Sequence, residues 1–436
     1  MLKLNAHLDT MQPRNEPLRS MQSATTSVLH MEPTKPSAPQ RSSAYAGYRS
    51  SVRFEGLVNL GNTCYLNAVM QAVRSLREFT AALGAMCESA PLFGEGDLFR
   101  STAQVLEQMD ATSILASGPV SPAKVRQHIA LSNPMFGNSG QQDAHEFFLE
   151  FVNQLHDELL ERHNASVPPP QVALATHLWL DCEVKKSIVC CQCGHGSWKN
   201  DKFRDFSLDF CETGVQSLSR MICAYFADEF LDFRCVQCPA TTARLEKHLM
   251  APPRVLVLHL KRFMPDLRLQ RYDKRNDEVD VPQQLDLHAC LQASGCAVPA
   301  QVAESPARGP ARPLARATSE VAPECVIVPT APAPSPARPS LARAKAGAEG
   351  SLARAEGADD PLRLWYDLRS AVSHEGPSLN AGHFVSFAES RDGLWQLHDD
   401  SVVRDLPEYP RGELGRKAYL LYYVLREVSG DGTITA

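Results

Sequence analysis

The stretch from Phe54 to Val73, FEGLVNLGNTCYLNAVMQAV, predicts a buried helix that begins at a cysteine. Asn62 and Thr63 are residue types that favour the N-cap position. After Cys64, apolar side chains recur at the three- and four-residue spacing of a helix. We therefore expect the core to be built around a helix whose first residue is a thiol.

The position of Cys64 favours a reactive thiol. Backbone N–H groups at a helix N-terminus form the positive end of the helix dipole, which favours the thiolate over the thiol. Gly56 and Gly61 loosen the backbone on the approach to this residue. An ordinary buried core cysteine is the alternative, unless other segments supply the rest of a site.

Composition excludes several classes of function. The 436 residues, 44% of them apolar, can form two or three domains or one large domain with insertions. The net charge is −6 and no dense Lys/Arg stripe is interleaved with aromatics, so we expect no nucleic-acid ligand. No signal peptide or membrane-spanning run is evident, which predicts a soluble protein of the cytoplasm, the nucleus or both. The thirteen cysteines indicate reduced thiols and metal ligands rather than disulfides.

Two segments have the composition of disordered chain. Residues 1–52 lack sustained periodicity and are expected to be an N-terminal tail, with 53–427 as the folded domain and 428–436 as a C-terminal tail. From about 296 to 360 the composition collapses to Ala, Pro, Arg, Ser and Gly, which predicts a disordered insertion within the domain.

Helical periodicity also marks the segment that starts at Ser139, and shorter helices are plausible near 96–109 and 121–131. In SGQQDAHEFFLEFVNQLHDELLERH, Ser139 and Gln142 have the spacing of a capping box, and one stripe is apolar. The first turn is expected to expose Gln141, Asp143 and Glu146. Taken alone, these groups indicate only favourable electrostatics at a helix start.

Four cysteines form two C-x2-C knuckles, Cys190 with Cys193 and Cys235 with Cys238. Four thiolates make a complete tetrahedral structural zinc site, which leaves no open position for catalysis. The long gap between the knuckles requires them to meet at the end of an extended hairpin or subdomain. The alternative is a set of reduced thiols that has lost its metal.

Strand patterns dominate the last third of the chain. RVLVLHLKRF, residues 254–263, predicts a buried strand, and so does AYLLYYVL, residues 418–425. Between them, a hairpin with its turn at 390–393 places His383 opposite Asp400, or opposite Asp399 if the register shifts by one residue. Hairpin geometry alone leaves both aspartates open as partners of the imidazole. Gly382, next to the histidine, is expected to open room for a substrate backbone.

These residues together are the parts of a thiol-dependent acyl-transfer enzyme. Cys64 would be the nucleophile, His383 the general base, and one of the two aspartates the group that orients the ring. Asn59, on the loop before the cysteine, can offer a side-chain N–H to an oxyanion, together with the Cys64 amide.

The chain resembles the ubiquitin-specific proteases, a branch of the papain-like cysteine peptidases. The resemblance spans about 53–425 and rests on several blocks in the same order: GLVNLGNTCYLNAVMQAV, QQDAHEFF, the two C-x2-C knuckles, LHLKRF, YDLRSAVSHEGPSLNAGHFVSF, and W-x3-D-D-S-x-V followed by AYLLYY. It implies an α+β, papain-like fold with a helical thumb, a β-rich palm and zinc-bearing β fingers.

The resemblance also implies residue roles. Cys64 would be the nucleophile, His383 the base and Asn59 the oxyanion donor, and the third triad member would be Asp399, with Asp400 as a supporting neighbour. Gln141, Asp143 and Glu146 would lie beside the channel for the C-terminal tail of ubiquitin, where acidic groups suit its arginines.

The expected function is that of a deubiquitinase, a hydrolase that cleaves isopeptide or peptide bonds at the C-terminal glycine of ubiquitin through a thioester intermediate. Its partners would be ubiquitin and ubiquitylated proteins, and its one cofactor a structural zinc ion that takes no part in catalysis. The alternatives are an inactive ubiquitin-binding scaffold and a protease for another ubiquitin-like modifier.

Overall fold

The computed structural model of the chain divides into two units, Met1–Tyr48 and Arg49–Ala436, and the second contains every residue that the structure describes. The structure describes residues 52–53, 55–89, 97–115, 118–165, 175–211, 216–266, 271–294, 364–379, 381–428 and 434–435. The predicted insertion at about 296–360, and the predicted tail of residues 1–52 except for its last residue, lie outside these ranges. Within them, no helix has both the length and the apolar character needed to cross a membrane.

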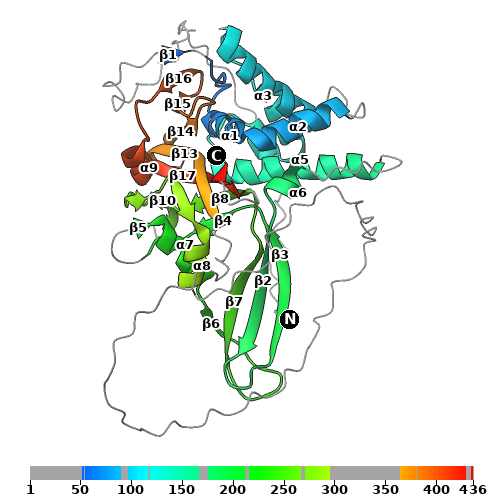
Figure 1. The fold of residues 1–436 in the computed structure, drawn as a ribbon, viewed down its shortest axis with the longest axis vertical. Coiled ribbons are helices and arrows are strands. Elements are labelled where there is room, and N and C mark those ends of the chain that lie inside the picture. Colours follow the sequence, from blue (N-terminus) through cyan, green and yellow to red (C-terminus); the bar gives the residue numbers. More distant parts are fainter. Residues whose placement is uncertain are drawn as a thin grey trace, which may run out of the picture. The chain divides into compact units, whose positions relative to one another are not determined.

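The first part of the second unit is helical (Figure 1). Its elements are α1 (Cys64–Arg74), α2 (Arg77–Ser89), α3 (Leu98–Leu115), α4 (Ala123–Ser132), the 3-10 helix η2 (Pro134–Gly137), α5 (Ala144–Ala165) and α6 (Ala175–Trp179). The helix expected to begin at Cys64 is confirmed as α1, and α3 and α4 lie where short helices were expected. Helix α2 was not expected, although Phe79, Leu83 and Met86 recur at helical spacing on the face that packs on the core.

The predicted cap of α5 is wrong. The side chain of Gln142 donates to Asn138 Oδ1, and the helix begins two residues later, at Ala144. Asp143 is the residue that caps it, since its Oδ1 accepts from the backbone N–H groups of His145 (2.6 Å) and Glu146 (3.0 Å). A carboxylate at this position also complements the helix dipole.

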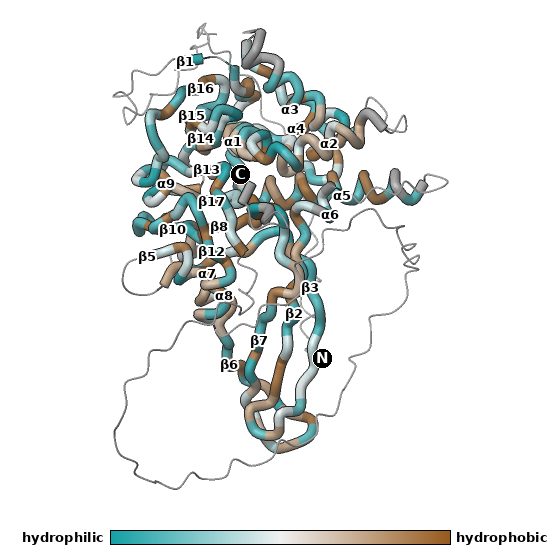
Figure 2. The backbone as a smooth tube through the Cα atoms, viewed as in Figure 1, coloured by the Kyte–Doolittle hydropathy of each residue, from teal (hydrophilic) through white to brown (hydrophobic). Residues whose placement is uncertain are grey.

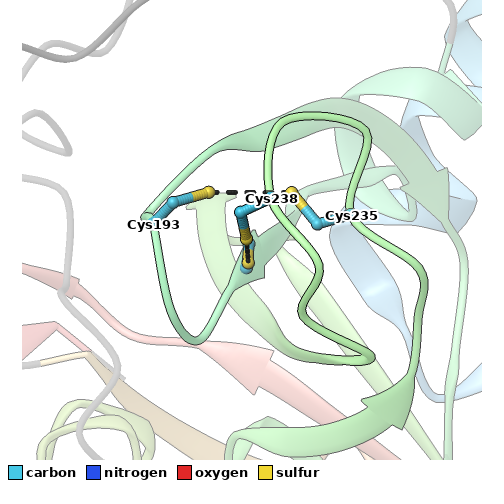
Figure 3. Close-up of side chains that lie close together, drawn as sticks. Cys193, Cys235 and Cys238 are labelled. Carbon is cyan, nitrogen blue, oxygen red and sulfur yellow. Dashed lines mark hydrogen bonds between the residues drawn. The ribbon is translucent and has the colours of Figure 1, made fainter.

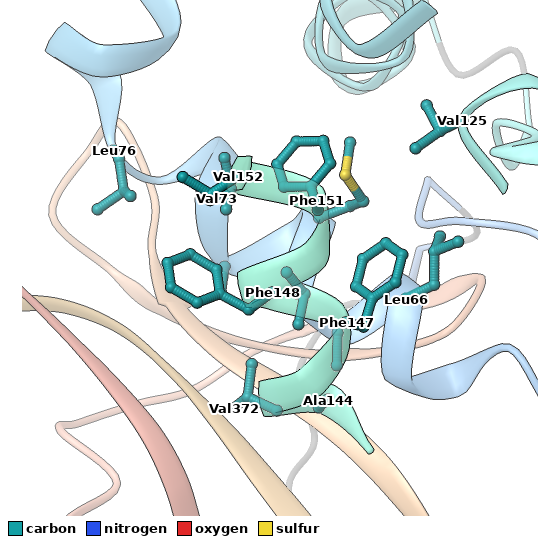
Figure 4. Packing of buried hydrophobic residues seen from close by; sticks show 14 of the residues in the cluster. Leu66, Val73, Leu76, Val125, Ala144, Phe147, Phe148, Phe151, Val152 and Val372 are labelled. Carbon is teal, nitrogen blue, oxygen red and sulfur yellow. The ribbon is translucent and has the colours of Figure 1, made fainter. Parts of the chain in front are cut away.

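Helices α1 and α5 form the centre of the hydrophobic core cluster (Figure 4). Every residue of α1 except Arg74 is buried, and the apolar face of α5 is lined with phenylalanines. Val372, from the sheet, also belongs to this cluster. The helix that carries Cys64 is thus fixed on several sides by close packing.

The sheet behind these helices has nine strands in the described part of the chain. Eight follow the order β1-β16-β15-β14-β13-β17-β8-β4, and β12 pairs with β13 at one side. Their bounds are β1 (Val52–Arg53), β4 (Phe206–Leu208), β8 (Val255–Leu260), β12 (Gln284–Asp286), β13 (Trp365–Ser378), β14 (Ala381–Glu389), β15 (Trp395–Asp399), β16 (Val402–Asp405) and β17 (Ala418–Leu425). The buried strands expected at 254–263 and 418–425 are confirmed as β8 and β17, which pair with each other.

A separate four-stranded sheet extends away from the helices and the large sheet (Figures 1 and 2). Its order is β3-β2-β7-β6, with bounds β2 (Cys182–Cys190), β3 (Gly196–Phe203), β6 (Glu229–Asp232) and β7 (Thr242–Ala251). The remaining elements are β5 (Gln216–Ser217), α7 (Leu218–Phe226), β9 (Phe263–Asp266), β10 (Arg271–Lys274), β11 (Val279–Asp280), α8 (Leu287–Ala293), α9 (Arg411–Lys417), β18 (Glu427–Val428) and β19 (Ile434–Thr435).

Candidate active site

Cys64 is the first residue of α1 and is buried, with 4% of its surface exposed. Thr63 occupies the N-cap position, as expected for this pair of residues, but makes no capping hydrogen bond with its side chain. Its hydroxyl instead accepts from the backbone N–H of Leu60 (2.8 Å), and Asn62 adopts a positive φ of 53°. The loop thus bends sharply just before the thiol.

His383 lies near the start of β14, and its Nε2 is 2.8 Å from Asp399 Oδ1, at the end of β15. The expected register was wrong, because β14 and β15 pair Ser386 with His398 and Glu389 with Trp395. Continued along the strands, this register places His383 opposite neither aspartate. Asp399 and His383 are diagonal neighbours on one face of the sheet, close enough for a hydrogen bond.

The histidine is held in its charged form. Burial, the largest single influence, lowers the pKa of His383. Hydrogen bonds to Asp399 and Cys64 and the negative charges of Cys64 and Asp400 outweigh burial and raise the pKa to about 11. The imidazole therefore lies between a thiol and a carboxylate.

Asp400 turns the chain between β15 and β16 with a φ of 50°. Its Oδ2 is 4.0 Å from His383 Nε2, too far for a hydrogen bond. Its carboxylate accepts from Asn59 Nδ2 and Asn67 Nδ2, both at 2.8 Å, and its carbonyl oxygen accepts from Gln71 Nε2 at 2.7 Å. The second aspartate is thus anchored to α1 and to the loop before it.

Sequence reasoning missed Asn67 and Gln71. Both are almost fully buried, with 0% and 1% of their surface exposed. A signal was present, because two amides one turn apart on an otherwise buried apolar helix need polar partners.

Gly56 was expected to loosen the backbone. In the structure it instead allows two segments to approach closely. Its N–H donates to Ser401 O (3.1 Å), and the neighbouring Leu57 N–H donates to Asp400 O (2.8 Å). A Cβ at position 56 would lie 3.0 Å from the carbonyl carbon of Asp400 and closer still to its oxygen. Only glycine fits this contact without displacement.

Asn59, the expected oxyanion donor, is exposed on the loop before Cys64. Its Oδ1 accepts from the backbone of Gly61 (2.9 Å) and Thr63 (3.2 Å), which fixes the orientation of the amide. One hydrogen of its Nδ2 is bound to Asp400, so a second remains for another acceptor.

Three residues around the start of α5 were expected to be exposed together, and the structure separates them. Glu146 is exposed, Gln141 is half-buried, and Asp143 is buried at 7% exposure, so the expectation for Asp143 was wrong. Its Oδ2 accepts from Tyr419 Oη at 2.5 Å. Gln141 hydrogen-bonds both the carbonyl oxygen (2.9 Å) and the N–H (3.3 Å) of Gly382.

Gly382 makes room for a protein side chain on its Cβ side, rather than for a substrate as was expected. A Cβ built there would overlap the ring of His374 and would lie 2.5 Å from Glu375 O. The segment before His383 thus has Gln141 hydrogen-bonded to its backbone and the His374 ring against its α-carbon.

The two cysteine knuckles meet at the far end of the four-stranded sheet (Figure 3). The Sγ atoms of Cys190 and Cys238 are 3.6 Å apart, and so are those of Cys193 and Cys235. All four lie within 4.8 Å of one another and could hold a metal ion. In a tetrahedron with metal–sulfur bonds of about 2.3 Å the sulfurs are about 3.8 Å apart, so the spacing fits.

A second cluster that could hold a metal ion contains His145, Asp205 and His259. In the structure these three side chains are instead hydrogen-bonded to one another or to Ser207. Asp205 Oδ2 contacts His145 Nε2 at 2.9 Å and Ser207 Oγ at 3.1 Å, and Ser207 contacts His259 Nδ1 at 2.8 Å. Burial, then the nearby His145 and Lys261, lowers the pKa of His259 to about 2.

A family model described as "Ubiquitin carboxyl-terminal hydrolase" matches residues 55–423. Among curated proteins, ubiquitin carboxyl-terminal hydrolase 37 of Gallus gallus is 29% identical over 261 residues, covering 54% of this chain and 26% of that protein. Ubiquitin carboxyl-terminal hydrolase 12 of Salmo salar is 25% identical over 416 residues, covering 85% of this chain and 90% of that protein. The chain thus spans about a quarter of the length of the first of these relatives.

A solved structure with a similar fold is titled "Structure of the SAGA Ubp8/Sgf11/Sus1/Sgf73 DUB module bound to ubiquitin aldehyde". The TM-score is 0.58 at 20% identity, over 85% of this chain and 69% of the matched chain. This likeness, together with the family match, confirms the expected α+β, papain-like fold.

Proposed function

The chain belongs to the ubiquitin-specific protease family, and we propose that it is a thiol-dependent deubiquitinase. Its reaction would be hydrolysis of isopeptide or peptide bonds at the C-terminal glycine of ubiquitin. The observation that carries this proposal is the position of His383, which contacts Cys64 on one side and Asp399 on the other. This order of nucleophile, base and orienting acid suits acyl transfer.

The proposed reaction has two halves. The Cys64 thiolate attacks the carbonyl carbon of the terminal glycine, and the oxyanion accepts from the Cys64 amide and from the second hydrogen of Asn59 Nδ2. The His383 imidazolium then gives its proton to the leaving amine, and a thioester forms. In the second half, neutral His383 removes a proton from water, which attacks the thioester and releases ubiquitin. Asp399 keeps the ring oriented throughout.

We propose that the tail of ubiquitin enters beside the start of α5. Glu146 is exposed there and offers a carboxylate to the arginines of the tail. Partial burial of Glu146, followed by the negative charge of the buried Asp143, raises the pKa of Glu146. Gln141 would act on the channel by holding Gly382 in place.

We assign zinc to the four-cysteine cluster, with Cys190, Cys193, Cys235 and Cys238 as ligands. Four thiol ligands favour zinc over harder cations such as magnesium or calcium. A closed site of this kind would join the β2–β3 turn to the β6–β7 loop and leave no position for substrate. Metal analysis of the purified protein tests the assignment, and less than one zinc per chain with all four cysteines intact would contradict it.

The proposed domain spans residues 53–427, with tails on both sides and an insertion at about 296–360. We also propose that the protein acts in the cytoplasm, the nucleus or both, on ubiquitylated proteins. The short final strands β18 and β19 pair with each other rather than with the large sheet, in keeping with a separate C-terminal segment.

A ubiquitin probe with a thiol-reactive C-terminus tests the proposed activity. We expect one probe to attach to Cys64, the Cys64→Ala variant to lose labelling, and the matched control Cys191→Ala, at an exposed cysteine, to keep it. Probes built on other ubiquitin-like modifiers identify the preferred modifier. Folded protein that binds ubiquitin without labelling or turnover would instead indicate an inactive scaffold.

A further inference from the structure

His374 is a fully buried histidine in the second half of β13, directly behind the segment that carries His383. Its ring meets Phe263 edge to face with centroids 5.0 Å apart, and Phe384 with centroids 4.8 Å apart. The ring fills the space in which a side chain at Gly382 would lie. Any movement of this ring therefore moves the backbone next to His383.

Lys274, the last residue of β10, holds this ring from the other side. Its Nζ contacts three acceptors: His374 Nδ1 at 3.0 Å, His374 O at 2.7 Å and Gly376 O at 3.1 Å. An ammonium group has three N–H donors, so the set is complete. Because Nδ1 accepts, the ring proton of neutral His374 lies on Nε2, which faces Gly382.

The same lysine fixes an irregular part of the strand. The pairing of β13 with β14 shifts between Glu375 and Ser378, and Gly376 there has a φ of 124°. Glu375 pairs with His383 across the strands. Without Lys274, the carbonyl groups of this bulge lose the donor that holds the bend beside the histidine.

We propose that Lys274 and His374 are a positioning pair that fixes the backbone and ring orientation of His383. The inference rests on the proposed function, in which His383 is the catalytic base. Gln141 binds the backbone of Gly382 from α5, and the pair supports the same residue from β10 and β13. His383 is thereby set between Cys64 and Asp399 before substrate arrives.

The surrounding charges fit this role. Burial, followed by the charges of Arg262 and Lys417, lowers the pKa of Lys274 to about 8, while Glu375 opposes the shift. Burial and Lys274 lower the pKa of His374 to about 3. Near neutral pH the lysine is therefore charged and the histidine neutral, as the donor–acceptor contact requires.

The variant Lys274→Met keeps most of the stem and removes all three donors. A misplacement of about 1 Å can lower a rate about a hundredfold, so we expect kcat to fall about tenfold to a hundredfold. KM should stay within about twofold, because the proposed role of the pair is to place the reacting histidine and not to bind ubiquitin. Combined with Cys64→Ala, the variant should bind ubiquitin with the Kd of Cys64→Ala alone.

Two further variants provide a control and a test of the His374 ring. Lys261→Met is the matched control, because Lys261 pairs with Asp209 at the surface (2.9 Å) and should leave kcat unchanged. His374→Asn keeps an oxygen acceptor for Lys274 but removes the ring behind Gly382, and we expect a loss of kcat similar to that of Lys274→Met. All assays run at least about 15 °C below the measured Tm, so that unfolded protein does not account for the loss.

The ring signals of His383 in ¹⁵N-histidine-labelled protein provide a readout that does not depend on turnover. We expect the signal of the Nε2–H bound to Asp399 to shift or broaden in Lys274→Met and to stay in place in Lys261→Met. Unchanged His383 signals, or a kcat within about twofold of wild type, would overturn the proposal. Wild-type protein without ubiquitin hydrolysis would refute the proposed function, whereas the His383 signals would still decide whether the pair positions the ring.

Discussion

Replacing Gly56 by alanine should damage the active site from a position eight residues before Cys64. The added Cβ would lie 3.0 Å from the carbonyl carbons of Asp400 and Ser401 and closer still to Asp400 O. Since carbon atoms pack at about 3.5–4.0 Å, the two backbones must separate by about 1 Å. Both partners of this clash are backbone, so rotation of a side chain cannot relieve it.

The expected cost follows from the contacts that would break. Two hydrogen bonds, Gly56 N–H to Ser401 O and Leu57 N–H to Asp400 O, contribute about 1 kcal/mol each. Overpacking adds about 1–3 kcal/mol, so the free energy of unfolding should fall by about 3–5 kcal/mol. At about 2–3 °C per kcal/mol for a large domain, Tm should fall by about 6–15 °C. Displacement of the Asp399–Asp400 turn by about 1 Å should lower kcat about a hundredfold.

Thermal unfolding and turnover of a fluorogenic ubiquitin substrate measure the two effects. Gly84→Ala is the matched control: Gly84 lies in α2 with open space around its α-carbon, so alanine should be neutral or stabilise by up to about 1 kcal/mol. A Gly56→Ala protein with the Tm and kcat of wild type would refute the close approach of this loop to Asp400.

Three further perturbations test other parts of the site. Cys64→Ala removes a hydrogen bond and a negative charge that both raise the pKa of His383, so an NMR titration should find a pKa below about 11; an unchanged value would exclude the contact. Asp399→Asn should lower kcat at least about a hundredfold with little change in Tm. Asp400→Asn alters the carboxylate that accepts from Asn59 and Asn67, so it should lower Tm as well. The opposite pattern would mean that the two aspartates have each other's role. Removal of metal by a strong chelator, or Cys235→Ser, should lower Tm by several degrees, and an unchanged Tm would mean that the cluster holds no structural metal.

Local patterns in the sequence predicted the elements on which the candidate site lies. The start of α1 at Cys64 and the strands β8 and β17 follow from apolar periodicity and from uninterrupted apolar runs, both of which are local properties. The meeting of the four cysteines follows from ligand chemistry, because two knuckles of the same type suit one shared ion.

The predictions that failed concern contacts between distant segments. The register of β14 with β15 depends on a turn whose centre differs by half a residue from the expected one, and sequence spacing does not resolve that difference. The end of β15 at Asp399 depends on the positive φ of Asp400, which is stabilised by contacts from Gly56 and α1 more than 300 residues away. The cap of α5 moved to Asp143 because Tyr419 is available to bind its second oxygen.

Helix α1 positions both ends of the proposed triad. Cys64, Asn67 and Gln71 are spaced by three and four residues, so they lie along one face of the helix. A buried NH2 group without an acceptor costs about 1–3 kcal/mol, and Asp400 supplies an acceptor for the side-chain NH2 group of both residues, through its carboxylate and its carbonyl oxygen. The turn that carries Asp399 is therefore fixed to the helix that carries the thiol. Packing of α1 in the core then sets the nucleophile and the acid together, and the position of His383 is left to the strands and side chains behind Gly382.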